Sequence, residues 1–400
     1  MQGCKNAALP ILIGAILNRG ENVIHNVPLI EDVFTMKEIL LSLGCKVKIE
    51  DNTFYINSKN LNNPKISERL IRKMRSSIVL MGALIALEKE CTFTLPGGCD
   101  IGLRPIDMHL KALKQLGAVI EEENGVIKCY GNDLVGKNIQ LDYPSVGATE
   151  NLMFASVFAK GVTSIGNAAK EPEIIDLQNF LNSMGARVYG AGGNTVYIEG
   201  TGKLNEFNEY TVMEDRIVAG TFMSLVHMTS GELFIKGCKI DNMKAIYYKL
   251  LESNLKIKPY SDGVLIKSDG KIHSVDSIIT LPYPGFPTDM QSQMTSMLTL
   301  ANGVSIINET IFENRFKYTT LLQRMGADIT VTKQIAIVKG VKKLNPAKMY
   351  ATDLRGGACL VNAALATKGE STIENIDYIK RGYENYASSL RSIGADIKEK

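Results

Sequence analysis

The chain has 400 residues, enough for two domains of ordinary size. Apolar residues make up 45% and charged residues 22%, so the chain can bury large cores, and a formal net charge of +3 does not indicate a nucleic-acid-binding protein. The sequence holds no run of 18 apolar residues that could cross a membrane. We therefore expect a globular protein in which any anion is bound by a local cluster of charges.

The N-terminal segment MQGCKNAALPILIGAIL loosely resembles a signal peptide, but it lacks a small-x-small cleavage site and segments of its type recur five more times. The seven cysteines are scattered without CxxC spacing, which is typical of reduced thiols in a cytoplasmic protein. No two of the four histidines stand at metal-ligand spacing. We expect neither a metal nor another cofactor.

A repeat of about 70 residues runs through the chain. Its marker is Gly or Asn between a helical pattern and a β-branched stretch, as in LGAVIEE from Leu116 and MGADITV from Met325. Steps of 68 to 73 residues separate the markers, which are Gly44, Gly117, Gly185, Asn254, Gly326 and Gly394. Six markers separated by five near-equal steps indicate six copies of one structural unit.

Each marker ends an amphipathic helix, because the last residue of a helix is often left-handed and Gly adopts that conformation readily. A second helix, apolar or small on every side, precedes it, and such a helix is buried all round. Between them we predict a short strand, and after the marker a hairpin, with Asn124–Gly125 as one of its turns. The buried helices are predicted at 5–17, 76–87, 147–159, 216–228, 289–301 and 356–367.

Six units predict an α/β fold of two domains with three units each, the helices inside and the sheets outside. We place the boundary near residue 213, so that the first domain is 5–213 and the second is 1–4 with 214–400. The last unit stops without its final strand, and the first begins almost directly on its buried helix. We expect that residues before Met1 would supply the missing strand.

Polar residues cluster at the starts of the buried helices. Exposed amide groups at a helix start attract anions, and parallel helices would bring these starts to one rim of each domain. We therefore expect a phosphate site in a cleft between two rims; helix caps and surface ion pairs are the alternative explanation. The residues concerned are Lys5, Asn6, Arg75, Ser145, Val146, Gly147, Asp215, Arg216, Asp289, Asp353 and Arg355.

The densest polar loop is LPGGCDIGLRPIDMHL at 95–110. Its glycines and the nearness of Cys99 to Arg104 are typical of a mobile loop with a reactive thiol, because cations lower the thiol pKa from about 8.5. The alternative is an inert, buried cysteine, but glycines beside Cys99 disfavour deep packing.

Eight stretches resemble, in chain order, the UDP-N-acetylglucosamine 1-carboxyvinyltransferase family. They are KNAALP at 5–10, LPGGCDIGLRPIDMH at 95–109, PSVGATEN at 144–151, NAAKEPEI at 167–174, FPTDMQ at 286–291, FENRF at 312–316, DLRGGA at 353–358 and RGYE at 381–384. The resemblance implies two inside-out α/β barrels in a monomeric cytoplasmic enzyme. It also implies transfer of enolpyruvate from phosphoenolpyruvate to the 3′-hydroxyl of UDP-N-acetylglucosamine (UDP-GlcNAc), which releases phosphate and begins peptidoglycan synthesis.

The resemblance further implies residue roles. Cys99 would be the acid that protonates phosphoenolpyruvate and the target of fosfomycin, and Asp289 the base that accepts the hydroxyl proton, although Asp289 also stands where a helix cap is expected. The implied catalytic residues are Cys99, Asp289, Lys5, Arg104 and Arg381. Those implied for phosphoenolpyruvate are Lys5, Asn6, Cys99, Arg104, Arg355 and Arg381. Those implied for UDP-GlcNAc are Asn6, Arg75, Arg104, Pro105, Ile106, Asp107, Met108, Ser145, Val146, Gly147, Asp289 and Ile311.

Three further positions keep two interpretations each, and a fourth departs from the family pattern. His109 either tunes the Cys99 loop or is structural, and Glu171 and Glu173 are either functional acids or a solvated helix start. Tyr143 stands where some family members carry Lys, so it would stack on uracil rather than pair with diphosphate.

Three alternative functions stay open from the sequence. They are 5-enolpyruvylshikimate-3-phosphate synthase, which would not need the Cys99 loop, a non-catalytic nucleotide-sugar-binding paralogue, and a repeat scaffold that binds proteins.

Overall fold

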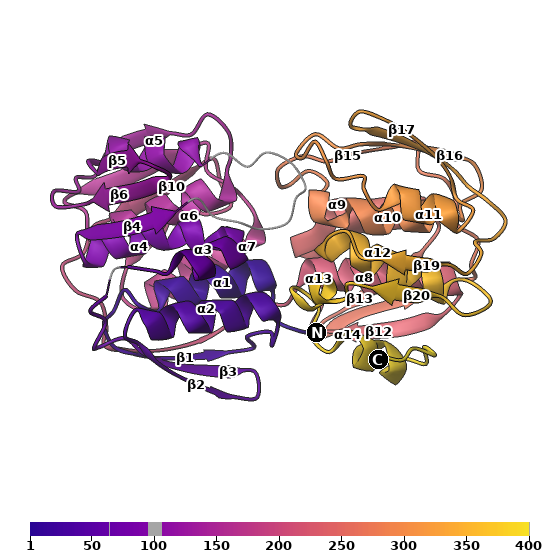
Figure 1. The fold of residues 1–400 in the computed structure, drawn as a ribbon, viewed down its shortest axis with the longest axis horizontal. Coiled ribbons are helices and arrows are strands. Elements are labelled where there is room, and N and C mark those ends of the chain that lie inside the picture. Colours follow the sequence, from indigo (N-terminus) through magenta and orange to yellow (C-terminus); the bar gives the residue numbers. More distant parts are fainter. Residues whose placement is uncertain (64, 95–105, 400) are drawn as a thin grey trace. The chain divides into compact units, whose positions relative to one another are not determined.

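A computed structural model describes residues 1–63, 65–94 and 106–399, which form two compact α/β units (Figure 1). The described part of the first unit is 3–63, 65–94 and 106–213, and that of the second is 1–2 with 214–399. Gly3 and Cys4 were expected in the second domain but lie in the first unit, where the Cys4 amide donates to the Met213 carbonyl at 2.8 Å.

The helices of the first unit alternate between buried and amphipathic. They are α1 (Lys5–Gly14), α2 (Glu31–Ser42), α3 (Glu68–Lys73), the 3₁₀ helix η1 (Arg75–Val79), α4 (Leu80–Leu87), α5 (Asp107–Leu116), α6 (Val146–Ser156) and α7 (Pro172–Ser183). Helices α1, α4 and α6 are buried nearly throughout, as their all-round apolar pattern predicts. They form the centre of one continuous hydrophobic core.

Sheets form the outer layer of the first unit, and in Figure 1 the strands β1, β2 and β3 lie outside α1 and α2. Its strands are β1 (Glu21–His25), β2 (Lys46–Glu50), β3 (Thr53–Asn57), β4 (Glu90–Thr94), β5 (Val119–Glu123), β6 (Val126–Tyr130), β7 (Asn138–Gln140), β8 (Val162–Gly166), β9 (Arg187–Tyr189), β10 (Thr195–Glu199) and β11 (Phe207–Thr211). They pair in the orders β11-β1-β3-β2, β4-β6-β5 and β7-β8-β10-β9.

Each repeat contributes a short backbone segment to the sheet of another repeat. Strand β7 follows the β5–β6 hairpin of the second repeat but pairs in parallel with β8 of the third. Strand β11 follows the third repeat and pairs in parallel with β1 of the first, and an isolated parallel bridge joins Lys65 to Thr92 of the second. The second and third repeats therefore take backbone from the repeat before them, and the first takes it from the third, which ties the three repeats together.

The second unit repeats this plan. Its helices are α8 (Arg216–Thr229), η2 (Ile240–Met243), α9 (Lys244–Glu252), η3 (Thr288–Met290), α10 (Gln291–Leu298), α11 (Thr319–Arg324), α12 (Leu354–Leu365), α13 (Asp377–Lys380) and α14 (Tyr386–Ser392). Its strands are β12 (Glu232–Lys236), β13 (Lys256–Tyr260), β14 (Gly263–Lys267), β15 (Ser277–Ile279), β16 (Val304–Asn308), β17 (Asp328–Thr332), β18 (Ile335–Lys339), β19 (Lys348–Tyr350) and β20 (Thr372–Glu374). The inner helices α8, α10 and α12 pack against one another, and the sheet orders are β12-β14-β13, β15-β16-β18-β17 and β19-β20.

The helix-ending markers have the predicted backbone conformation. Gly44, Gly117, Gly185, Gly326 and Gly394 all have φ between +93° and +110°, and Asn254 of the degenerate repeat has φ +78°. Asn124 and Gly125 have φ +52° and +75°, the pair of positive values that a tight hairpin turn between β5 and β6 requires. The prediction of an α/β fold with helices inside and sheets outside is confirmed.

One predicted strand is absent. Residues 395–399 follow the last marker, Gly394, but form no strand, because no described segment offers a hairpin partner as β3 does for β2. Sheet β12-β14-β13 likewise has no parallel fourth strand among the described residues. Within the same residues, no helix is both long and apolar enough to cross a bilayer.

Candidate active site

Acidic side chains cap two inner helices of the second unit. Asp215 accepts from the amides of Ile217 and Val218 at the start of α8, and Asp353 accepts from Arg355 and Gly356 at the start of α12. For these two aspartates the capping interpretation is confirmed. They bring fixed negative charge to the helix starts and direct the first turn of each helix.

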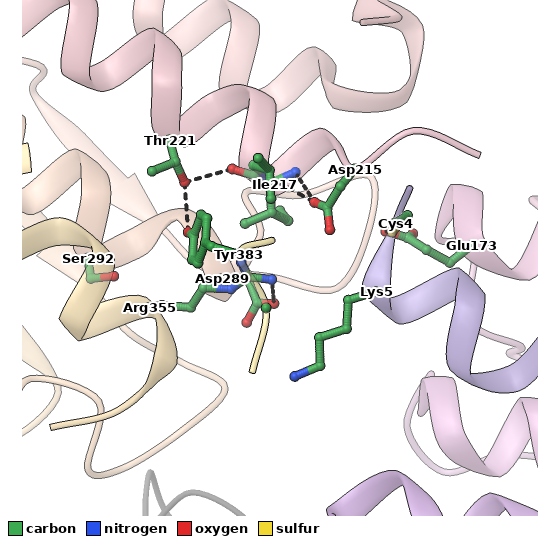
Figure 2. A network of polar contacts seen from close by, with 12 residues as sticks. Cys4, Lys5, Glu173, Asp215, Ile217, Thr221, Asp289, Ser292, Arg355 and Tyr383 are labelled. Carbon is green, nitrogen blue, oxygen red and sulfur yellow. Dashed lines mark hydrogen bonds and ion pairs between the residues drawn. The ribbon is translucent and has the colours of Figure 1, made fainter. Parts of the chain in front are cut away.

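Asp289 does not cap a helix. Its carboxylate lies between two guanidinium groups: Arg315 Nη2 donates to Oδ1 at 2.7 Å, and Arg355 Nη2 donates to Oδ2 at 3.1 Å (Figure 2 shows the Arg355 contact). The arginine side chains are 4% and 3% exposed, whereas that of Asp289 is 27% exposed. Two buried cations therefore hold one partly accessible carboxylate.

The charges decide the protonation state of this cluster. Burial raises the pKa of Asp289, but Arg355 and Arg315 outweigh that effect and hold the pKa well below its usual range. Burial lowers the pKa of Arg355, and the charge of Asp289 more than reverses this. Asp289 is therefore ionised at neutral pH, and it can accept a proton only if positive charge is drawn away from it.

Arg355 has hydrogen-bonding capacity to spare. Within the described residues, its Nε and Nη1 atoms are buried and have no hydrogen-bond acceptor. An unsatisfied donor on a buried cation is costly, and a planar guanidinium suits phosphate and carboxylate oxygens. Such a group beside Asp289 is fitted to bind an anion.

The predicted residues Ile311 and Arg381 also lie in the second unit. The buried carboxylate of Glu309 accepts from the Ile311 amide at 2.9 Å and from the Thr288 hydroxyl at 2.8 Å, which ties the Ile311 turn to the residue before Asp289. Arg381 follows α13 directly and is half-buried.

In the first unit, His109 joins three of the predicted stretches. A Cβ on Gly147 would lie 2.8 Å from its ring, so the start of α6 packs directly on His109 of α5. Asn151 Nδ2 lies 2.7 Å from His109 Nδ1 and 3.1 Å from the Ile78 carbonyl, and Asn151 Oδ1 accepts from the Gly82 amide at 2.7 Å. Since Nδ2 is a donor, Nδ1 accepts and the ring is neutral.

Burial, followed by the charge of Arg75, lowers the pKa of His109 to about 4. Of the two interpretations of His109, the environment supports the structural one, because the ring is buried, neutral and hydrogen-bonded. Through it the structure brings together Arg75, the segment 106–108 and the segment 145–147, all predicted for UDP-GlcNAc. Ser145 caps α6 by accepting from the Ala148 amide at 3.3 Å.

The start of α1 carries a paired cation. Lys5 Nζ lies 2.7 Å from Asp32 Oδ2, and both side chains are nearly buried. Asn6 is exposed beside it. Asp32 was not predicted as a site residue, because an aspartate in the first turn of α2 looks like an ordinary helix start.

The solvated interpretation of the acids near α7 is wrong for Glu173, which is 2% exposed and accepts from the Cys4 thiol at 3.7 Å (both are labelled in Figure 2). Glu150 on α6 is also buried. Burial, with the charges of Glu171 and Glu173, raises the pKa of Glu150 well above its usual value. These residues form a buried acidic group rather than a helix surface.

Comparison with known proteins decides the family. Residues 1–390 match the family described as EPSP synthase (3-phosphoshikimate 1-carboxyvinyltransferase). UDP-N-acetylglucosamine 1-carboxyvinyltransferase 2 of Caldanaerobacter subterraneus subsp. tengcongensis is 51% identical over 99% of this chain and 95% of its own. UDP-N-acetylglucosamine 1-carboxyvinyltransferase 1 of Symbiobacterium thermophilum is 47% identical over 99% of this chain and 91% of its own.

The chain belongs to the EPSP synthase family, in its UDP-N-acetylglucosamine 1-carboxyvinyltransferase branch. Two solved structures share the fold of this carboxyvinyltransferase. The enolpyruvyl transferase NikO from Streptomyces tendae superimposes with a TM-score of 0.90 at 21% identity, covering 100% of this chain and 94% of its own. An EPSP synthase from Acinetobacter baumannii gives 0.76 at 17% identity, covering 100% and 95%.

Three residues predicted for the carboxyvinyltransferase site, Cys99, Arg104 and Pro105, lie outside the described residues. Besides Asp32, two residues with evident roles were missed, Arg315 and Asn151. Both stand inside stretches that carry the resemblance, FENRF and PSVGATEN, which was the available signal. Arg315 stands 26 residues from its partner Asp289, and Asn151 stands 73 residues from its partner Ile78. These contacts exist only in the folded chain.

Proposed function

We propose that this protein transfers the enolpyruvyl group of phosphoenolpyruvate to the 3′-hydroxyl of UDP-GlcNAc and releases phosphate, an early step of peptidoglycan synthesis. The observation that carries the choice of acceptor is the 51% identity, over 99% of the chain, to a relative named for this reaction. The EPSP synthase structures share only 16% to 17% identity, so shikimate 3-phosphate is not the favoured acceptor.

In the second unit, we assign anion binding to Arg355 and Arg381 and the base to Asp289. The unsatisfied Nε and Nη1 donors of Arg355 support this assignment. An anion that accepts from them draws positive charge away from Asp289, whose pKa then rises toward a value useful for a base. Binding of phosphoenolpyruvate would in this way activate the carboxylate that takes the proton of the sugar hydroxyl.

In the first unit, we assign UDP-GlcNAc binding to the stretches packed around His109, namely Arg75, 106–108 and 145–147. The capped start of α6 supports an anion-binding role, because its remaining amides and Arg75 both favour negative charge. We assign Lys5 and Asn6 to phosphoenolpyruvate on the family resemblance.

The bond changes balance without a further reactant. Cys99 gives a proton to the methylene carbon of phosphoenolpyruvate, and the sugar oxygen bonds to C2 as Asp289 takes the hydroxyl proton. Phosphate then leaves as its bond to C2 breaks and takes up the proton held by Asp289. The Cys99 thiolate takes back a methyl proton, which restores the double bond. The roles of Cys99 and Arg104 rest on the resemblance alone.

We place the reaction in the cytoplasm. No disulfide joins the cysteines that the structure describes, which supports a reducing compartment.

The test is release of inorganic phosphate from phosphoenolpyruvate, measured alone, with UDP-GlcNAc and with shikimate 3-phosphate. We expect release with UDP-GlcNAc only. Release with shikimate 3-phosphate would overturn the acceptor, and binding of UDP-GlcNAc without any release would indicate a non-catalytic paralogue. A Cys99→Ser variant should still bind UDP-GlcNAc but lose turnover.

A further inference from the structure

Tyr383 lies among the three inner helices of the second unit, beside Arg355. It is 2% exposed, and its hydroxyl lies 2.9 Å from Thr221 Oγ1 on α8 and accepts from Gln293 Nε2 on α10 at 3.0 Å. Figure 2 shows Tyr383 between Thr221 and the Asp289–Arg355 pair. The Tyr383 hydroxyl therefore connects the inner helices α8 and α10, close to Arg355 of the third inner helix, α12.

The hydrogens of this network have only one arrangement. Thr221 Oγ1 donates its single hydrogen to the Ile217 carbonyl at 2.8 Å, so it can only accept from Tyr383. Gln293 donates to Tyr383 through Nε2, while its Oε1 accepts from the Ser292 hydroxyl at 2.9 Å. The Tyr383 hydroxyl thus donates once and accepts once, and the side chain cannot swing to another rotamer without breaking both bonds.

The fixed ring faces the arginine. The guanidinium carbon of Arg355 lies 5.4 Å from the centre of the Tyr383 ring, within the range of a cation–π contact. The guanidinium of Arg355 donates from Nη2 to Asp289, and in the described chain its buried Nε and Nη1 have no hydrogen-bond acceptor. The ring contact and the hydrogen bond to Asp289 together therefore fix which edge of the guanidinium faces Asp289 and which is left for an anion.

The backbone around Tyr383 is held independently. Gln2 Nε2 donates to the Gly382 carbonyl at 3.1 Å, and Gln2 Oε1 accepts from the Glu384 amide at 3.0 Å. One side chain thus holds the residues immediately before and after Tyr383. The position of the ring is set by its backbone as well as by its hydroxyl.

We propose that Tyr383 is a positioning residue for phosphoenolpyruvate: it orients Arg355 so that the free edge of the guanidinium faces the substrate anion. This role rests on the proposed function. It assigns to Tyr383 an effect on the donor substrate and none on the sugar nucleotide.

Tyr383→Phe keeps the ring and removes both hydrogen bonds, and Tyr383→Leu also removes the ring. Tyr318→Phe is the matched control, because Tyr318 is fully buried in the same unit and its hydroxyl lies 3.0 and 2.8 Å from Gln291 and Thr295 of α10. The melting temperatures of the two Phe variants should fall by similar amounts, so a difference in kinetics would not reflect stability.

For Tyr383→Phe we expect kcat/KM for phosphoenolpyruvate to fall about tenfold, and for Tyr383→Leu about a hundredfold, since small misplacements of a binding group have effects of this size. KM for UDP-GlcNAc should stay within about twofold of wild type in every variant, as should all constants of Tyr318→Phe. Equal losses in Tyr383→Phe and Tyr318→Phe, or a loss that falls equally on both substrates, would overturn the proposal.

Calorimetric binding of phosphoenolpyruvate tests the same idea without turnover. The dissociation constant should rise about tenfold in Tyr383→Phe and stay unchanged in Tyr318→Phe. If the wild-type protein released no phosphate, the proposed function would fall while this comparison still decided the role of Tyr383. Equal dissociation constants in the two variants would exclude that role.

Discussion

At the scale of single residues, the decisive arrangement is one carboxylate held by two buried arginines. Taking charges out of water is costly, so Asp289, Arg315 and Arg355 are stable together only because each charge has a partner. The same pairing makes Asp289 a weak base at rest. Proton transfer to Asp289 therefore depends on a bound anion that offsets the positive charge of Arg315 and Arg355.

Removing one arginine should expose this dependence. In Arg315→Met, Asp289 keeps only Arg355, so its pKa should rise from well below the usual range toward the ordinary value of about 3.9. Because the ionised form is the base, activity would then be lost as pH falls through a higher pKa. The acid limb of the pH profile of kcat/KM should move to higher pH.

Arg324→Met, which removes an exposed arginine of α11, is the control and should keep the wild-type profile. Arg315→Met should also lower stability by about 3 kcal/mol, because a charge pair loses one buried partner. An unchanged acid limb in Arg315→Met would show that Asp289 does not govern this part of the profile.

At the scale of elements, the first unit depends on the close approach of α4 to α6. A Cβ on Gly82 would lie 2.2 Å from the Asn151 carbonyl oxygen, and the Gly82 amide donates to the Asn151 side chain. Only a glycine permits this contact. Asn151 then reaches η1 and His109, so one helix crossing sets the position of three predicted binding segments.

Gly82→Ala tests that crossing. Alanine normally stabilises a helix interior by about 1 kcal/mol relative to glycine, but here the methyl group must push α4 from α6 at a cost of about 1–3 kcal/mol. We expect the melting temperature of the first unit to fall by about 5 °C, measured by calorimetry. Gly202→Ala is the control and should leave the melting temperature unchanged, because no atom lies within 4 Å of the added Cβ. A higher melting temperature in Gly82→Ala would contradict the close contact of α4 with α6.

At the scale of the whole molecule, each unit has its own hydrophobic core and its own buried neutral histidine. His109 belongs to the first unit and His227 to the second, where its ring contacts Ser268 and the Ser253 carbonyl. Burial lowers the pKa of both. Both units should therefore lose stability in mild acid, each through its own histidine.

The sign follows from proton binding. The pKa of His109 is about 4 in the folded unit and about 6.5 in the unfolded chain, so the unfolded chain binds more protons between these values and stability falls as pH drops from 6.5 to 4. The full effect is about 3 kcal/mol. Glu150 acts in the opposite direction, because its raised pKa favours the folded, protonated form in acid.

His109→Gln isolates the contribution of the histidine. In calorimetric scans between pH 7 and pH 4 (about the range set by the two pKa values), the first unit of the variant should lose less stability than that of wild type. The second unit should behave identically in both proteins. A parallel decline of the first unit in both proteins would show that His109 is not protonated on unfolding.

The sequence predicted the repeats well because the signals are local. A helix that must stop in a left-handed residue selects Gly or Asn, and Gly117 and Asn254 both have positive φ. An inner helix must be apolar on every side, and the sequence of α4 has this pattern. The strand predicted after Gly394 failed because a strand also needs a partner, which no pattern within five residues can supply.

By itself, then, the sequence determined the α/β class, the order of helices and strands, and the family. Tertiary structure alone decided that β11 pairs with β1, that Asp289 binds Arg315 and Arg355 instead of capping its helix, and that Tyr383 faces Arg355. The physical reason is distance along the chain. Propensity and periodicity act over one or two turns, whereas ion pairs and sheet edges form between groups that only packing brings together.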